Sequence, residues 1–233
     1  MVRYRTIASS RIAFWRSILS ETPTALTARQ KKKREEIIEI ASEIFLREGF
    51  GRTSMDQIHA RLGGSKRTLY SHFPKKEALF HTIVERISGR VFAALQPKPA
   101  EGAFERALFR MGYEYLSVLL SSEGIALYRI MTAEAHHFPE LSRDFFVRGP
   151  AVASKGLARF FEANQTAGNL VTSDARTAAE QFLGAVRGDV HLSAVLAGEQ
   201  PSQVVLEDKV ACAVRLFAKR PGIEKASDSP TQL

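Results

Sequence analysis

The sequence predicts an all-α fold in which three short helices precede a bundle of longer ones. Apolar residues recur at three- and four-residue spacing through every long segment of the chain, and Pro or Gly separates these segments. No convincing run alternates with the period of two that strands require. The chain has 233 residues, which is enough for one or two domains with sizeable cores.

The positive charge is confined to the N-terminal part of the chain. Residues 1–90 hold 18 Lys and Arg against 9 Asp and Glu, whereas residues 91–233 hold 15 against 16. A basic segment joined to a nearly neutral one is typical of a polyanion-binding head on a separate body. On charge alone, a merely solvated basic face remains the alternative.

The pattern divides the chain into four parts. Residues 1–28 show no sustained periodicity, and we expect either a flexible arm or an extension read from an upstream start codon. Residues 29–80 hold the three short helices, residues 81–220 form the helical bundle, and residues 221–233 are expected to be a flexible tail.

Cap residues define the three short helices. The first begins at Arg29 and ends at Gly49, which supplies the stop. The second follows Ser54, which is spaced from Gln57 as a capping box, and ends at the Gly pair 63–64. Ser65 caps the third, and Pro74 closes it because the residue before a proline is pushed out of the helical region.

Six longer helices follow, each bounded by Pro or Gly signals. We expect them at residues 76–95, 103–121, 125–135, 147–167, 174–197 and 202–219.

The third helix carries a polar face without an acidic residue. At 100° per residue, Leu69, Tyr70 and Phe73 fall on one arc and can pack inward. The opposite arc holds Arg67, Thr68, Ser71 and His72. Such a face can approach phosphates and base edges, and Arg67 is the best candidate for a bidentate contact with guanine. Two short helices joined by glycines, with this surface on the second, favour a helix-turn-helix that reads double-stranded DNA.

Lys75 and Lys76 stand at the start of the next helix, where a cation opposes the helix dipole. The arrangement makes sense if a DNA phosphate docks at that N-terminus. The alternative is that Lys75 is simply solvated and Lys76 pairs with a neighbour.

The stretch "RTSMDQIHARLGGSKRTLYSHFPKKEALF" resembles the DNA-binding domain of the TetR family of bacterial transcriptional regulators. The resemblance covers about residues 34–80 and implies phosphate contacts from Thr53 and Ser54, recognition by Lys66, Arg67, Thr68 and Ser71, backbone contacts from Tyr70 and His72, and a phosphate contact from Lys76. Ser65 also stands in a family position and joins the expected DNA-binding set.

Three residues depart from the family pattern. His59 replaces a small residue, Gly64 a Val, and Lys75 a capping residue. We expect Gly64 to loosen the turn, and His59 either to crowd the helix packing or to point toward the duplex.

The second part, through "LYRIMTAEAHHFPELSRDFF", resembles the AefR-like type of C-terminal domain. The resemblance implies a homodimer with a small-molecule effector cavity in each subunit. Six residues that combine apolar bulk with polar groups are candidates for the cavity, although core packing is the alternative for each: Met111, Tyr115, Tyr128, Met131, His137 and Phe161.

The last two long helices carry apolar faces that would suit a two-fold interface, with Gly184 and Gly188 permitting close approach. The candidates for this interface are Phe182, Val186, Val210, Val214 and Phe217. These faces could equally be buried in the body of the same subunit.

Other kinds of site find little support in the sequence. Glu134, His136 and His137 lack a second cluster at ligand spacing, so we expect no metal and no cofactor. Cys212 has no partner for a disulfide and is expected in the core. No apolar stretch approaches the roughly 20 residues that span a bilayer, and a cytoplasmic setting fits.

The sequence therefore predicts a DNA-binding regulator rather than an enzyme. It favours a repressor over an activator. The rival interpretations are a helical enzyme or metal-dependent protein with a basic head, and a protein that binds DNA without sequence preference.

Overall fold

The computed structural model describes residues 26–98, 103–165 and 174–218, and every regular element within these ranges is a helix. The all-α prediction is confirmed. The helices are α2 (Ala28–Glu48), α3 (Met55–Leu62), α4 (Lys66–His72), α5 (Lys76–Ala94), α6 (Phe104–Leu119), α7 (Ser122–Glu134), α8 (Pro139–Arg148), α9 (Pro150–Gln165), α10 (Ala175–Ala197) and α11 (Gln203–Phe217). The expected arm, as far as residue 25, and the expected tail, 221–233, lie outside the described residues.

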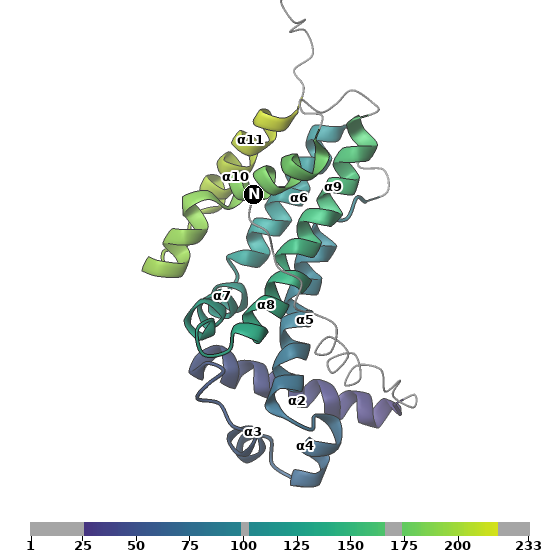
Figure 1. Cartoon of the computed structure of the whole chain (residues 1–233), viewed down its shortest axis with the longest axis vertical. Helices are drawn as coiled ribbons and strands as arrows, with labels where there is room; N and C mark the ends of the chain where they lie inside the picture. The colour runs from purple at the N-terminus through teal and green to yellow at the C-terminus, as the bar shows by residue number, and fades with distance from the viewer. Residues whose placement is uncertain (1–25, 99–102, 166–173, 219–233) are drawn as a thin grey trace, which may run out of the picture.

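Helices α2, α3 and α4 form a head at one end of the molecule (Figure 1). Helix α5 leads from the head into the body, where it packs on α6 and α9. Helices α10 and α11 pack against each other and against α6, and α10 also packs along α9. Helices α7 and α8 lie between the head and this bundle.

The predicted caps set the ends of the short helices. Ser54 and Gln57 form the capping box of α3, and Gly49 ends α2 with a φ of 89°. Helix α2 starts one residue earlier than predicted because Thr27 makes its own capping box with Gln30. Phe73 ends α4, as the following proline requires.

One helix was missed in the sequence pattern. Helix α8 occupies a segment that carried no prediction, and none of its residues is fully buried. The helix has only ten residues; Leu141 and Phe145 pack against the head core, whereas Phe146 and Val147 are exposed. Pro139 suits its first turn, and Gly149 ends it, so that α9 begins at Pro150 rather than at Val147.

The molecule has two apolar cores, and α5 and α7 contribute to the contacts between them. The head core centres on Phe45, Phe50 and Phe80, whose rings lie 5.0–6.0 Å apart. The body core includes Phe161 and Phe182. Three residues of α7 are buried in the head core: Leu127, Ile130 and Met131. The head is thus packed directly on a helix of the body.

Candidate nucleic-acid interface and ligand cavity

The turn between α3 and α4 is built from two glycines with positive φ, 69° at Gly63 and 74° at Gly64. A β-branched residue such as Val would be strained at Gly64. His59 Nε2 lies 3.0 Å from the carbonyl oxygen of Gly64. The contact of His59 with Gly64 stabilises the turn that Gly64 was expected to loosen. The two departures from the family pattern, Gly64 and His59, therefore compensate for each other.

Helix α4 presents its predicted polar face to solvent. Leu69 and Phe73 are buried, whereas Arg67 and Ser71 are exposed. Tyr70 was expected on the inner arc, but it is 43 % exposed and lies at the surface, because the head core is filled by the phenylalanines of α2 and α5. Thr68 is partly buried, and its carbonyl accepts a hydrogen bond from Ser71 Oγ at 2.8 Å.

The two basic residues at the start of α4 differ in their partners. Lys66 Nζ lies 2.8 Å from a carboxylate oxygen of Asp56. The hydrogen bond raises the pKa of Lys66 and lowers the pKa of Asp56. The guanidinium of Arg67 has no hydrogen-bond or ion-pair partner among the residues that the structure describes, so it is available to an outside anion.

Basic residues of α2 extend this surface. Burial lowers the pKa of His72, and the positive charges of Arg34 and Lys33 lower that pKa further. Arg34 also lies over the ring of Phe73, 4.9 Å from its centre. The basic run at the start of α2 and the polar face of α4 therefore form one electropositive surface, as polyanion binding requires.

Two of the residues expected to contact DNA make internal contacts that hold the head together. Thr53 is only 2 % exposed, and its hydroxyl donates to the carbonyl of Gly49 at 2.7 Å. Lys76 Nζ donates to the carbonyls of Phe50, Gly51 and Thr53 at 3.1, 3.4 and 3.2 Å. The ammonium also lies 4.5 Å from the centre of the Phe50 ring. Lys76 holds the α2–α3 connection against α5, which explains a cation at this helix start without a phosphate.

Ser54 and Ser65 act as helix caps and remain exposed. Ser54 Oγ accepts from the backbone of Gln57, and Ser65 Oγ accepts from the backbone of Arg67. Their positions at the rim of the helix-turn-helix leave them within reach of a docked backbone.

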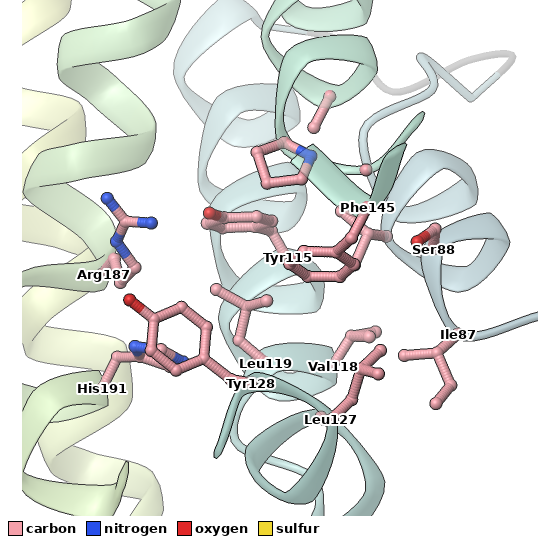
Figure 2. Close-up of a pocket in the computed structure, with 15 residues that line it drawn as sticks. Ile87, Ser88, Tyr115, Val118, Leu119, Leu127, Tyr128, Phe145, Arg187 and His191 are labelled. Carbon is pink, nitrogen blue, oxygen red and sulfur yellow. The ribbon is translucent and has the colours of Figure 1, made fainter. Parts of the chain in front are cut away.

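A cavity lies in the body, between α5, α6, α7, α8, α9 and α10 (Figure 2). It contains about 620 Å³ of empty space, part of which is open to solvent. Its lining is mostly apolar, with one polar side chain from α5, Ser88, and four from α6, α7 and α10. The lining residues are Ile87, Ser88, Val91, Tyr115, Val118, Leu119, Gly124, Leu127, Tyr128, Phe145, Gly149, Pro150, Ala153, Arg187 and His191. A mostly apolar lining with a few polar groups is typical of sites that bind small organic molecules.

The structure brings two of the six candidate cavity residues, Tyr115 and Tyr128, to this lining. Met111 and Phe161 are fully buried in the body core, and Met131 is buried in the head core. His137 is exposed near the end of α7. Arg187 and His191, which do line the cavity, were missed because their role depends on packing between helices distant in sequence.

The five candidates for the dimer interface are buried inside the subunit: Phe182, Val186, Val210, Val214 and Phe217. Their stripes are the inner faces of α10 and α11, packed on α6 and α9. Gly188 does not serve close approach either. Its φ of 41° and ψ of −151° interrupt α10 and kink it. Cys212, expected in the core, is exposed.

Other side chains remain exposed on the outer faces of α10 and α11. Leu196 is 76 % exposed, and Leu192, Val204, Val205 and Leu216 are also exposed large apolar residues. Cys212 and Leu216 lie one turn apart on α11. This is an apolar surface on a single subunit.

Two contacts connect the cavity with the head. Leu127 lines the cavity and is also part of the head core. Further along α7, the Glu134 carboxylate accepts a hydrogen bond from the backbone amide of Gly51 at 2.7 Å. Gly51 belongs to the same connection that Lys76 holds.

Neither a metal site nor a membrane span is found among the described residues. No three His, Cys, Asp or Glu side chains there gather in an arrangement that could hold a metal ion. None of the described helices is long and apolar enough to cross a membrane.

A basic helix-turn-helix beside a ligand-sized cavity defines a DNA-binding regulator. Residues 37–83 match the family model of bacterial regulatory proteins of the tetR family, and residues 106–221 match that of the AefR-like transcriptional repressor C-terminal domain. The chain belongs to the TetR family of transcriptional regulators. Regulators of this family bind DNA and small-molecule effectors and act as dimers.

Individual proteins are similar over most of the chain. The flavonoid-responsive regulator FrrA is 34 % identical, with a TM-score of 0.67 over 80 % of this chain and 95 % of that one. A TetR-family regulator from Mesorhizobium loti is 25 % identical, with a TM-score of 0.72 over 83 % of this chain and all of the other. The regulator TcmR from Streptomyces glaucescens is 29 % identical over 157 residues, which span 62 % of this chain and 66 % of TcmR, just under two thirds.

Proposed function

We propose that the protein is a cytoplasmic homodimeric repressor that leaves a palindromic operator when a small molecule enters the body cavity. The observation that carries this proposal is the position of Leu127, which lines the cavity and is also buried in the head core. A ligand that moves α7 would therefore change the packing under the DNA-binding surface. A coupling of about 1–3 kcal/mol would change operator occupancy by one or two decades.

The proposed reading surface is the exposed face of α4. Arg67 would contact base edges, Lys66, Ser71 and Tyr70 would add base or backbone contacts, and the basic start of α2 would add phosphate contacts. In a dimer the two α4 helices would enter successive major grooves, about 34–36 Å apart or somewhat more.

The proposed dimer surface is formed by the exposed apolar side chains of α10 and α11, among them Leu196 and Leu216. An exposed apolar strip next to a complete subunit core is typical of a two-fold helical interface. We expect Leu196→Asp to shift the protein toward monomers in analytical ultracentrifugation, whereas the buried Phe182 stripe would affect folding instead.

The proposed effector is a small molecule with a ring-containing apolar body. The mostly apolar cavity supports this, and so does the flavonoid response stated in the name of FrrA. Repression rather than activation is supported by the AefR-like repressor domain over residues 106–221.

Selection of bound duplexes from a random pool tests the proposal. We expect a palindromic sequence whose half-sites are separated by about one helical turn or more. Retention of all sequences equally would contradict operator recognition and favour binding without sequence preference. Failure to retain any duplex at low salt would contradict DNA binding altogether.

A further inference from the structure

Four of the five polar side chains that line the cavity gather at one end, whereas Ser88 lies on the other side, near Phe145. Figure 2 shows the hydroxyl groups of Tyr115 and Tyr128 turned toward the side where Arg187 lies, with His191 beside Tyr128. The Tyr128 and His191 rings meet edge to face at 4.7 Å between centres. Phe145 and Ile87 line the other side of the cavity. The cavity thus has a polar end and an apolar end.

The positive charge at the polar end has no counter-charge among the described residues that line the cavity. No Asp or Glu lines the cavity, and Arg187 has no hydrogen-bond or ion-pair partner among the described residues. The charge of Arg187 lowers the pKa of Tyr115, although burial raises that pKa more strongly. A cation among apolar groups without a counter-charge favours the entry of an anion.

His191 offers a second unpaired group at the same end. Its side chain is only 4 % exposed, and its Nε2 atom is buried without a hydrogen-bond partner. Burial and the neighbouring Arg187 lower the pKa of His191, so the ring is neutral at pH 7. Buried polar atoms are normally satisfied, and a ligand oxygen or hydroxyl would satisfy this one.

We infer that the cavity binds an apolar organic acid, with its anionic oxygens against Arg187 and its apolar body toward Phe145. The hydroxyls of Tyr115 and Tyr128 would donate to the same oxygens, and the neutral ring of His191 would bind a further polar group of the ligand. This inference rests on the proposed role of the cavity as the effector site and adds the chemical class of the effector.

Calorimetric titration of the full-length protein with 2-naphthoate and with its uncharged amide, 2-naphthamide, tests the inference. The two probes have nearly the same shape and differ by the charge. We expect the acid to bind about 10- to 100-fold more tightly than the amide, since a hydrogen-bonded charge contributes that much in a dry site.

Variants locate the source of this preference. Arg187→Gln is expected to remove the preference for the acid while leaving the amide affinity unchanged, and Arg187→Lys to retain part of it. Tyr115→Phe, which removes only a hydroxyl, is expected to lower the acid affinity several-fold. Arg176→Gln is the matched control, because Arg176 lies on the same helix, is 76 % exposed and does not line the cavity.

Equal binding of acid and amide to the wild type, no binding of the acid at millimolar concentration, or a preference that survives in Arg187→Gln would overturn the inference. Titration of the same samples against the selected duplex separates the two proposals. Release of DNA by neutral apolar compounds, unaffected in Arg187→Gln, would contradict the acid class and leave the proposed function standing. Binding of the acid without DNA release would contradict the proposed function alone.

Discussion

Two arginines without internal partners mark the two working regions of this protein. Arg67 lies on the exposed face of α4, in the head, and Arg187 lies at the polar end of the enclosed cavity, in the body. Neither side chain pairs with a carboxylate among the described residues. Lys66, the neighbour of Arg67 in the sequence, does have such a partner in Asp56.

The difference between them lies in the surroundings. Water and salt screen the charge of Arg67. The attraction between the head and DNA therefore depends on many charges acting together, and it falls as the ionic strength rises. Arg187 is half-buried at one end of a mostly apolar cavity, so a single ligand charge is screened less there and salt matters less. The same side chain can thus serve a polyanion on a surface and one small anion in a cavity.

The largest expected effect concerns Lys76, the head cation that does have internal partners. Lys76→Ala removes a charged donor from three carbonyls, and we expect the free energy of unfolding to fall by about 2–3 kcal/mol. Urea unfolding measures this loss. The salt dependence of DNA binding should stay unchanged, because the ammonium contacts the protein rather than phosphate.

Lys66→Ala is the control for Lys76. It breaks an exposed ion pair and is expected to cost less than about 1 kcal/mol of stability. A lower salt slope for Lys76→Ala together with an unchanged free energy of unfolding would show that Lys76 binds phosphate after all.

Arg67→Ala tests the exposed arginine. We expect the affinity for the selected duplex to fall by about 1–3 kcal/mol, because a bidentate base contact is lost. The affinity for random duplex should change much less. Fluorescence anisotropy with both duplexes measures the two losses, and equal losses would rule out base reading by Arg67.

Glu134→Ala tests the connection between the two regions. Without the carboxylate, the amide of Gly51 loses its contact with α7. We expect the free energy by which bound 2-naphthoate weakens DNA binding to decrease by about 0.5–2 kcal/mol. DNA affinity with and without the acid measures this, and Glu140→Ala, on an exposed side chain of α8, is the control. An undiminished ligand effect would place the coupling elsewhere.

A further expected effect is a pH dependence of stability. Hydrogen bonds to Asp144, which is the larger cause, and to Glu85 raise the pKa of His81 from 6.5 to about 9. Because the unfolded chain releases this proton near its ordinary pKa, the stabilisation is complete below about pH 6.5 and is lost as the pH rises through about 9. Urea unfolding at several pH values between about 6.5 and 9 should show that the free energy of unfolding of the wild type falls as the pH rises. The free energy of unfolding of His81→Gln should lack this fall. Parallel declines in both proteins would assign the pH dependence to other groups.

Much of the fold could be predicted because its signals are local. Ser54 with Gln57, Gly49 and Pro74 each act within one helical turn, so the sequence alone places the ends of the short helices. Helix α8 escaped prediction because it has only ten residues, and none of them is fully buried.

The sites were predicted less completely, since they depend on which surfaces meet. Periodicity shows that Phe182 and Val186 share an apolar face, but it does not show whether the same subunit or a partner covers that face. Lys76 looked like a phosphate ligand until the carbonyls of residues 50, 51 and 53 were found around it. Arg187 gains its role only where α10 meets α6 and α7.

The most direct test of this account compares Arg67→Ala and Arg187→Gln in one DNA-binding experiment with the selected duplex, with and without 2-naphthoate. We predict that Arg67→Ala weakens DNA binding in the absence of the acid and leaves acid binding intact. Arg187→Gln should bind DNA like the wild type and no longer release it when the acid is added. If Arg187→Gln weakens DNA binding without the acid as much as Arg67→Ala does, the division of work between the two arginines is wrong.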